Sequence, residues 1–311
     1  MSKRIYDTVI IGGGPSGYSA ALYASRAGLD TLVIEKMSAG GQMMLTDIIE
    51  NYPGFKDGID GFTLSENMRI QAEKYGAETV YDEISSCELS GTVKKLCGFS
   101  KEYLAKTVII AAGASPRKLG LDKEEKLTGR GVHYCAHCDG RFYKDKTVAV
   151  IGGGNSAVAD ALYLSKLAKK VYLIHRRDTL RATKIYLQPL SQASNIEIIY
   201  DSVAEDIVGE NRIDGLKIRN VKDSKARDIT CDGIFISIGR KPETDFLGDE
   251  IGLDDSGYII AGEDTKTNLS GVFAAGDVRT KRLRQVVTAV ADGAVSAELA
   301  MEYIERENII I

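Results

Sequence analysis

A strand, a glycine-rich loop, a helix and a second strand follow one another twice in this chain. This duplication constrains the fold more than any other feature. In the first copy the apolar run at residues 8–11 leads into 12–17, which match Gly-x-Gly-x-x-Gly. A helix is expected from Pro15 to Ala27, ended by Gly28, and a strand at 31–34. This order predicts a dinucleotide-binding unit of the Rossmann type.

The second copy repeats the order, with a strand at 147–151, a loop at 152–157, a helix at 155–167 and a strand at 171–174. Glycines allow the tight turn and the approach of a pyrophosphate, which the helix N-terminus attracts. A purely structural glycine turn is the alternative, but the flanking strands and helices favour phosphate binding. The loop residues expected to contact cofactors are Gly12, Gly14, Pro15, Ser16, Gly17, Gly152, Gly154, Asn155 and Ser156.

The two copies differ at the residue that closes the second strand. Glu35 stands where a carboxylate binds ribose hydroxyls and repels a 2′-phosphate. In the second copy His175 holds this place, followed by Arg176, Arg177 and Arg181, which offer bidentate donors to a phosphate. We therefore expect a dinucleotide without a 2′-phosphate in the first site and NADPH in the second. A solvated basic helix start is the alternative for the arginines.

Two dinucleotide sites in one chain indicate electron transfer between them. The nicotinamide delivers hydride, so the other cofactor is expected to be a flavin that accepts it. Cys135 and Cys138 lie just before the second copy and are candidates for the next electron carrier. Asp139 follows them and can hand a proton to a departing thiolate or take it back.

Other interpretations of this segment stay open. The cysteine spacing also suits two metal ligands, with His133 and His137 nearby, but structural zinc needs four ligands and no second cysteine pair has this spacing. The pair can also be two small buried side chains, and Asp139 a turn residue. The cysteines that we expect to be packing residues are Cys87, Cys97 and Cys231.

Composition bears on several classes of function. The net charge of −4 offers no basic field for nucleic acid or an anionic membrane. No apolar run reaches the roughly 18 residues of a membrane span. Five cysteines, an odd number, argue against a secreted disulfide framework, and residues 1–4 lead directly into a strand rather than a cleavable leader. We expect a cytoplasmic protein without nucleic-acid, membrane or metal partners.

The rest of the chain suggests a discontinuous domain. A helix is expected at 64–75, short antiparallel strands at 78–111, hairpins within 195–240 and a C-terminal helix at 286–303. Gly239 precedes Pro242 as Gly113 precedes Pro116, which indicates two similar crossings around an insertion. The expected domains are residues 1–116 with 242–311, and residues 117–241 between them.

The order and spacing of these motifs resemble those of low-molecular-weight thioredoxin reductases across essentially the whole chain. The matching motifs are residues 12–17, 40–42, 135–140, 152–157, 175–178 with Arg181 and Ala182, and Gly276-Asp277 with Arg284-Gln285. The resemblance implies an α/β fold with two Rossmann-like domains of the three-layer ββα type. It also implies FAD on the outer segments, NADPH on the inserted domain and a homodimer.

The resemblance also implies a mechanism. NADPH reduces FAD, and the reduced flavin opens the Cys135–Cys138 disulfide, with Cys138 nearest to the flavin. Cys135 then attacks the disulfide of thioredoxin, and Asp139 serves as acid and base. Further cofactor contacts are expected from Gly41, Gln42, Asn51, Gly113, Gly276, Asp277, Arg284 and Gln285.

Two positions depart from the family pattern. His137 stands between the cysteines where the family usually has Thr, which is expected to change thiol chemistry or partner choice. Residues 288–293 read Thr-Ala-Val-Ala-Asp-Gly where Thr-Ala-Ala-Gly-x-Gly is usual, which is expected to alter packing beside the flavin. The alternatives are a related flavoprotein serving a glutaredoxin-like or peroxide-reducing partner, and a zinc-dependent binding or scaffold protein.

Overall fold

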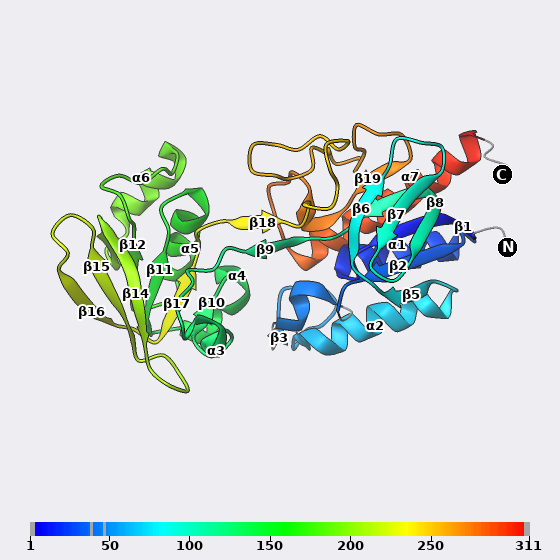
Figure 1. Ribbon diagram of the computed structural model, residues 1–311. Coiled ribbons are helices and arrows are strands. Elements are labelled where there is room, and N and C mark those ends of the chain that lie inside the picture. The colour runs from blue at the N-terminus through cyan, green and yellow to red at the C-terminus, as the bar shows by residue number, and fades with distance from the viewer. Residues whose placement is uncertain (1–3, 38–39, 46–47, 308–311) are drawn as a thin grey trace. The chain divides into compact units, whose positions relative to one another are not determined.

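The computed structural model describes residues 4–37, 40–45 and 48–307, so residues 1–3 of the N-terminal segment considered above lie outside the described part. The chain forms two compact units, Met1–Ser115 with Lys241–Ile311, and Pro116–Arg240. It passes between them twice, through β9 (Ala114–Pro116) and β18 (Arg240–Pro242), which pair as a two-stranded sheet (Figure 1).

The first unit is built on a seven-stranded sheet in the order β5-β2-β1-β8-β7-β6, with β19 also paired to β8. Its parallel strands are β1 (Ile5–Ile11), β2 (Thr31–Glu35), β5 (Glu78–Tyr81), β8 (Glu102–Ile110) and β19 (Val272–Ala274). The antiparallel strands β6 (Ile84–Glu88) and β7 (Lys94–Gly98) join the beginning of β8. The prediction of antiparallel strands throughout residues 78–111 is therefore wrong for β5 and for the end of β8.

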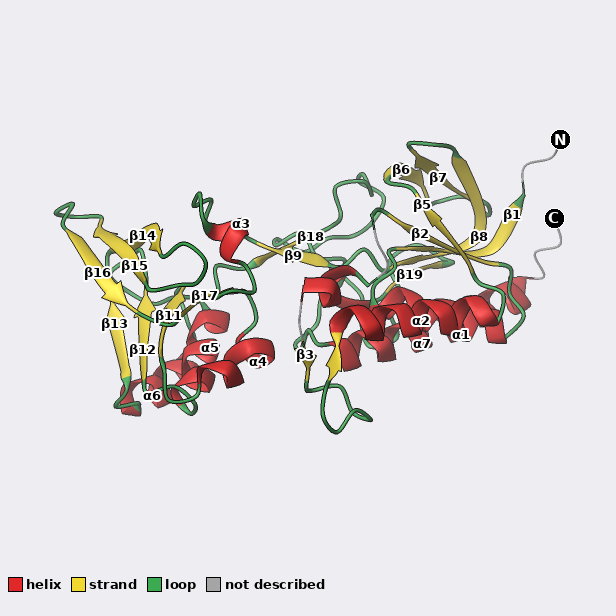
Figure 2. Cartoon of the chain, turned by 90° about the horizontal axis from the view of Figure 1, so that it is seen from below, coloured by secondary structure: helices red, strands yellow, loops and turns green. Residues whose placement is uncertain are grey.

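Both faces of the parallel sheet are covered, which explains the uninterrupted apolar runs. Because successive strand residues point to opposite faces, Ile10 packs with the alanines of the helices, whereas Val9 packs with Leu96 of the antiparallel strands. The helices lie together on one side of the sheet in Figure 2. They are α1 (Pro15–Arg26), α2 (Gly61–Lys74) and α7 (Val286–Glu307). The unit is thus a three-layer ββα arrangement.

The second unit repeats this arrangement on a smaller scale. Its parallel sheet comprises β10 (Val132–His133), β17 (Gly233–Ile236), β11 (Thr147–Ile151), β12 (Lys170–Ile174) and β13 (Ile196–Ile199). One face is covered by α5 (Asn155–Ser165) and α6 (Lys184–Gln192), and the other by the antiparallel strands β14 (Ser202–Val208), β15 (Gly215–Asn220) and β16 (Ala226–Thr230) (Figure 2). The predicted α/β fold with two Rossmann-like units is confirmed.

Local sequence signals set the helix ends. Pro15 begins α1, and Gly28 follows its end with φ +84°. Helix α2 begins earlier than predicted, at Gly61, because the Asp60 carboxylate accepts a hydrogen bond from the Thr63 N–H at 2.8 Å. The short elements are η1 (Gly41–Leu45), β3 (Ile48–Ile49), β4 (Ile59–Asp60), α3 (Glu124–Leu127), α4 (Ala136–Asp139), η2 (Gly140–Tyr143) and η3 (Gly276–Val278).

Candidate active site

Cys135 and Cys138 form a disulfide, with Cα atoms 5.3 Å apart. Cys135 caps the helical turn α4, and its Sγ accepts a hydrogen bond from the Cys138 N–H at 3.2 Å. Both residues are half-buried. Within the described ranges no group of three or more His, Cys, Asp or Glu side chains could hold a metal ion. The disulfide interpretation of the pair is therefore the one that the structure supports.

The three other cysteines are free thiols in different surroundings. Burial raises the pKa of the Cys87 and Cys231 thiols to about 12, so both stay protonated at neutral pH. Cys231 lies in the core of the second unit, Cys87 packs against that of the first, and Cys97 is half-buried on β7. Their surroundings match packing roles.

The disulfide turn is packed tightly against α5. A Cβ atom on Gly140 would lie 3.0 Å from the side chains of Tyr163 and Leu164, so glycine allows this close approach. The exposed ring of His137 lies on the Tyr163 ring, with centroids 4.2 Å apart. The residue that departs from the family pattern thus joins the disulfide turn to α5.

Asp139 contacts a buried histidine. Its Oδ2 lies 3.0 Å from His133 Nδ1, and the side chains of His133 and Asp139 are 8% and 19% exposed. His133 Nε2 lies 2.7 Å from the Tyr143 hydroxyl. In the sequence alone His133 stands out only as a zinc candidate, and Tyr143 carries no signal. Only the packing of β10, α4 and η2 brings these three residues together.

The first glycine loop is closed on one side and open on the other. A Cβ atom on Gly12, whose φ is +105°, would lie 2.5 Å from the Ala111 carbonyl oxygen, and one on Gly17 would lie 1.9 Å from the Gly12 oxygen. In contrast, a Cβ atom on Gly14 would meet nothing within 4 Å. Gly14 caps α1 without a side chain, so the first amides of this helix face an open cradle.

Glu35 lies beside this loop at the end of β2. Its Oε2 accepts a hydrogen bond from the Gly13 N–H at 2.6 Å. The Gly13 oxygen accepts from the Gly40 N–H at 2.7 Å, which brings the start of η1 to the loop. Gly41 is close to Gly14, because a Cβ atom added to Gly41 would lie 3.6 Å from the Gly14 Cα. Gln42 follows in η1. The strand-end acid and the 40–42 motif therefore meet at one loop.

Residues from the C-terminal part of the chain reach the same helix end. A Cβ atom on Gly276 would lie 2.5 Å from Ser16 Oγ, so the turn carrying Asp277 packs against the start of α1. Gln285, directly before α7, accepts a hydrogen bond from Asn51 Nδ2 at 2.8 Å. The Gly276 turn thus lies at the first glycine loop, and the hydrogen bond from Asn51 to Gln285 joins another distant segment to the start of α7.

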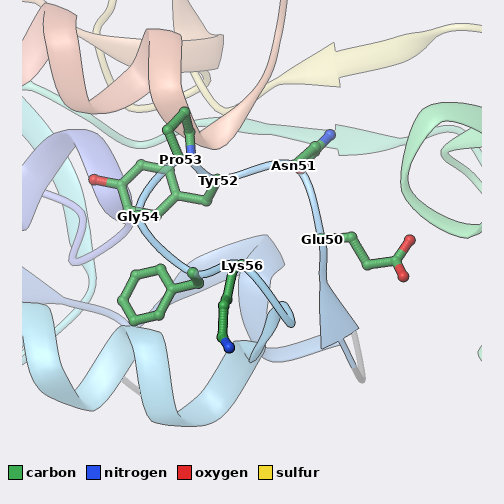
Figure 3. A pocket seen from close by; sticks show the side chains of 7 residues that line it. Glu50, Asn51, Tyr52, Pro53, Gly54 and Lys56 are labelled. Atoms are coloured by element: carbon green, nitrogen blue, oxygen red, sulfur yellow. The ribbon is translucent and has the colours of Figure 1, made fainter.

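Asn51 also belongs to a loop that lines a hollow, shown in Figure 3. The hollow is lined by residues 50–56, and the rings of Tyr52 and Phe55 stack there with centroids 6.1 Å apart. All of its lining residues come from this one loop. It is therefore distinct from the cradle at Gly14.

A buried ionic cluster supports the Gly276–Asp277 turn. Asp292 accepts hydrogen bonds from Arg279 Nη2 at 2.7 Å and Nε at 2.9 Å, from Lys281 Nζ at 2.8 Å and from the Gly276 N–H at 2.8 Å. The side chains of Arg279, Lys281 and Asp292 are 1%, 4% and 7% exposed. Burial alone would raise the pKa of Asp292, but the hydrogen bonds from Arg279 and Lys281 hold it below its usual range.

Arg284 braces the same turn. Its guanidinium donates to the carbonyl oxygens of Asp277 at 3.4 Å, Arg279 at 3.2 Å and Lys281 at 3.2 Å, and it lies 4.1 Å from the Tyr258 ring centroid. We expected Arg284 to contact the cofactor. In this structure its guanidinium contacts protein groups. Arg279 is not among the residues predicted for the site, although its position two residues after Asp277 is a usable signal.

The second glycine loop is held by the histidine that follows β12. The His175 ring is buried, and a Cβ atom on Gly153 would lie 2.2 Å from its Nδ1. Burial lowers the pKa of His175, and the charges of Arg181, Arg176 and Arg177 lower it further, against a backbone hydrogen bond at Thr179. A neutral His175 therefore packs under the loop.

The three arginines beside this loop are exposed. The Arg181 N–H donates to the Gly153 oxygen at 2.7 Å, which fixes the basic segment next to the loop. Gly154 caps α5, and a Cβ atom there would meet nothing within 4 Å. Asn155 Oδ1 accepts from the Thr183 N–H at 2.8 Å, and Ser156 is exposed.

The residues present fit the expected cofactors. Each loop presents an open cradle at a helix start whose N-cap residue is a glycine, so no side chain occupies the first amides and a pyrophosphate can bind there. The first loop faces an acid, Glu35, and the second lies next to three exposed arginines, which suits a ribose hydroxyl and a 2′-phosphate respectively. None of the helices in the described part of the chain combines the length and apolar character needed to span a membrane.

Comparisons with known proteins agree with this site. The family model of pyridine nucleotide-disulphide oxidoreductases matches residues 6–293. Curated thioredoxin reductases of Peptoclostridium acidaminophilum and Listeria monocytogenes are 44% and 46% identical over 97% and 98% of this chain, and over 98% and 95% of their own lengths. The thioredoxin reductase structure from Streptococcus pyogenes aligns with a TM-score of 0.91 at 44% identity, covering 98% of this chain and all of that one. That from Giardia duodenalis aligns with the same score at 36% identity, covering 97% and 100%. The chain therefore belongs to the thioredoxin reductases within the pyridine nucleotide-disulphide oxidoreductase family.

Proposed function

We propose that this chain is an NADPH-dependent flavoprotein that reduces the disulfide of thioredoxin through FAD and the Cys135–Cys138 disulfide. The single observation that carries the proposal is this disulfide, formed in the same unit as an arginine-flanked dinucleotide loop. Family membership supplies the reaction type. Thioredoxin, the partner of the relatives by their names, is the disulfide substrate.

Each unit holds one cofactor in this proposal. Residues 1–116 with 242–311 bind FAD, supported by the open cradle at Gly14 and by Glu35 beside it. Residues 117–241 bind NADPH, supported by the cradle at Gly154 and by the exposed arginines. Asp277 and Gln285 complete the FAD site from the C-terminal segment, since their backbone lies at the start of α1 and at that of α7.

FAD, when bound, supplies the two-electron relay between the nicotinamide and the disulfide. The remaining steps belong to the chain itself. Once the disulfide is reduced, the Cys135 thiolate attacks thioredoxin, forming one S–S bond and breaking thioredoxin's own. Asp139 gives its proton to the thiolate that leaves. Cys138 then attacks the mixed disulfide, which restores the Cys135–Cys138 bond and releases thioredoxin as a dithiol.

The finer assignments are also proposals. The resemblance to thioredoxin reductases supports a homodimer. The free thiols Cys87, Cys97 and Cys231 support a reducing compartment, the cytoplasm. His137, where the family usually has Thr, is a determinant of partner choice, since its ring is exposed on the disulfide turn.

Reduction of a panel of small disulfide proteins under NADPH tests the function. The purified protein is expected to be yellow and to oxidise NADPH in proportion to the thioredoxin thiols that appear. A glutaredoxin-like protein and a peroxide-reducing protein serve as the competing substrates. Preferred reduction of either one would favour the alternative reductase, and a colourless protein with bound zinc would overturn the proposal.

A further inference from the structure

We propose that His133 is a positioning residue for Asp139, which it holds at the end of a hydrogen-bonded chain that runs from Tyr143 through His133 to Asp139. The inference rests on the proposed function, in which Asp139 exchanges a proton with the thiols. It adds to that function the group that orients Asp139 and stabilises its ionised form.

The three residues come from successive elements of the second unit. His133 ends β10, Asp139 ends α4, and Tyr143 ends η2. His133 Nδ1 lies 3.0 Å from Asp139 Oδ2, and His133 Nε2 lies 2.7 Å from the Tyr143 hydroxyl. Both ring nitrogens of one buried histidine therefore have partners, and one partner is the acid next to the disulfide.

The imidazole is held on its faces as well as at its nitrogens. The Phe235 ring stacks on it at 27° with centroids 5.2 Å apart, and the Tyr143 ring meets it at 72° with centroids 5.3 Å apart. His133 is 7% exposed as a whole residue. A ring fixed in this way presents Nδ1 to Asp139 in one direction, which is what a positioning residue must do.

The donor and acceptor groups determine the direction in which each hydrogen bond of this series is donated. An ionised carboxylate only accepts hydrogen bonds, so His133 Nδ1 carries the proton that faces Asp139. In the neutral ring Nε2 then accepts from the Tyr143 hydroxyl. Burial raises the pKa of Tyr143, and the negative charge of Asp139 adds to this, so the phenol keeps its proton. When Asp139 is protonated, the opposite tautomer accepts from it and donates to Tyr143.

Ionisable groups of the surrounding elements also lie near these three hydrogen-bonded residues. Asp232 and Cys231 lie near enough to Tyr143 to raise its pKa, and Lys146 Nζ lies 5.5 Å from the Tyr143 ring centroid. These groups are at the Tyr143 end. On α4 itself the ring of His137 lies on Tyr163 of α5.

The consequence for proton transfer follows from charge balance. When Asp139 gives its proton to a thiolate, a thiol and a carboxylate result. The His133 N–H stabilises this carboxylate, so it favours the transfer. Without His133 the carboxylate loses this hydrogen bond and its fixed orientation. Solvent resupplies the proton, because Asp139 is partly exposed.

The test uses the FAD-loaded full chain and three substitutions. His133→Phe keeps a ring for Phe235 but removes both hydrogen bonds. His133→Asn keeps a donor near the Nδ1 position but cannot reach Tyr143. Tyr134→Phe is the matched control. It also removes a partly buried tyrosine hydrogen bond, at 2.6 Å to Glu124, but this bond is not part of the Tyr143–His133–Asp139 chain.

Two readouts are expected to move together. His133→Phe should lower kcat for thioredoxin reduction about fivefold to tenfold with little change in KM, and should change the pH profile of kcat. His133→Asn should recover part of kcat. After reduction with a dithiol, the pH dependence of iodoacetamide alkylation of Cys135 should shift in His133→Phe and not in Tyr134→Phe.

An unchanged alkylation profile in both His133 variants would overturn the inference, even if kcat or the melting temperature fell. If His133→Phe does not fold, Tyr143→Phe replaces it, since it removes one oxygen atom and should give a smaller shift in the same direction. Failure of the proposed function looks different. In that case the unmodified protein does not reduce thioredoxin, whereas its alkylation profile still tests the coupling of His133 to the thiols.

Discussion

The two cysteines of the disulfide are not equivalent residues. Cys135 caps the turn α4 and accepts a hydrogen bond from the Cys138 amide, whereas Cys138 lies within the turn. This donor favours the Cys135 thiolate once the disulfide opens, because a hydrogen bond to the charged form stabilises it. Cys135 therefore suits the attack on a protein disulfide, and Cys138 the exchange with the flavin.

Serine substitutions separate these roles. Cys138→Ser should keep FAD bound and reducible by NADPH but abolish thioredoxin reduction. Cys135→Ser should also be inactive, but its remaining Cys138 thiolate should change the visible absorbance of the flavin. Spectra of the two variants across pH 6–9 make the comparison, with Cys231→Ser as the control at a buried thiol. A spectral change in Cys138→Ser instead would reverse the assignment.

The arginines after β12 are expected to determine the preference for NADPH over NADH. Arg176, Arg177 and Arg181 are exposed next to the second loop and are available to a 2′-phosphate. A hydrogen bond to a charged group contributes about 1.5–3 kcal/mol, so replacing Arg176 and Arg177 by Ala should reduce the preference for NADPH over NADH at least about tenfold. The measurement is kcat/KM with each nucleotide.

Arg219→Ala is the matched control for this prediction. Arg219 pairs with Glu205 at 3.2 Å on the antiparallel sheet of the same unit, outside the basic segment at 175–181. Its removal should leave the preference unchanged. Equal use of NADH and NADPH by the unmodified protein would contradict the interpretation of the basic segment.

Sequence reasoning reached the residues that carry a local signature and missed those defined by packing. Glycine spacing identified both loops, and the cysteine spacing identified the disulfide. His133 and Arg279 escaped because their partners, Asp139 and Asp292, are reached through the fold rather than through a motif. His175 was expected to contact a cofactor like Glu35, and in the structure its ring packs under Gly153.

At the scale of elements, the turn from Gly276 to Lys281 depends on one carboxylate. Asp292→Asn should destabilise the protein by about 3–5 kcal/mol, because the buried Arg279 and Lys281 would lose their buried counter-charge and only the exposed Glu263, 3.8 Å from Arg279, would remain near them. The turn carries Asp277, so FAD affinity should fall as well. Urea unfolding of the FAD-loaded protein and FAD titration measure the two effects.

The pH dependence of this effect has a definite sign. The pKa of Asp292 is lowered in the folded protein, below the unfolded value of about 3.9. Its contribution to stability is therefore present above that pH and declines as pH falls through the folded pKa. The difference between Asp292→Asn and the unmodified protein should be equal at pH 7 and pH 5 and shrink below about pH 4.

Glu302→Gln is the control for Asp292→Asn. Glu302 pairs with Arg306 at 2.8 Å on the surface of α7, and losing such a pair typically costs about 0.3–0.5 kcal/mol. A similarly small cost for Asp292→Asn would mean that the buried cluster does not hold the turn.

The apolar runs predicted the strands well, but not always their direction. The run at 107–111 coincides with the end of β8, yet this strand pairs in parallel with β1 from Leu104 onward and with β19 at its end, and antiparallel with β7 at its beginning. Strand direction depends on partners far along the chain, which periodicity does not encode. Helix ends were closest where a cap or glycine marks them, as at Pro15 and Gly28.

At the scale of the whole molecule, the duplicated loop was the strongest guide. It predicted two Rossmann-like units because each copy contained a strand, a glycine-rich loop, a helix and a second strand. The crossings followed from a weaker pattern, a glycine three residues before a proline. In the structure both prolines lie in strands, β9 and β18, that pair with each other.

These crossings lead to the last prediction. The disulfide and the proposed NADPH loop belong to one unit, and the proposed FAD residues belong to the other. A hydride donor must come within about 3–3.5 Å of its acceptor, and the disulfide needs similar contact with the flavin. The resemblance to thioredoxin reductases implies that the second unit takes two arrangements in turn, and we expect the crossings to act as hinges.

Gly239 allows a test of the hinge without disturbing either site. It precedes β18 with φ +103°, and a Cβ atom there would meet only the Arg117 side chain, 3.7 Å away. Gly239→Ala therefore adds backbone strain of about 1–2 kcal/mol without steric overlap. If the crossing changes conformation during turnover, kcat should change about fivefold or more while both cofactors still bind. Gly248→Ala, at φ +62° with nothing within 4 Å, is the control and should leave kcat unchanged.

A covalent lock provides the stronger form of the same test. If the two electron transfers need different arrangements, a disulfide engineered between the two units and verified by mass spectrometry should stop turnover while FAD and NADPH remain bound. Fluorescence titration of NADPH and the flavin spectrum check binding. Full activity of the locked protein would show that a single arrangement brings both groups to the flavin. Any effect of Gly239→Ala would then have to arise within the crossing itself.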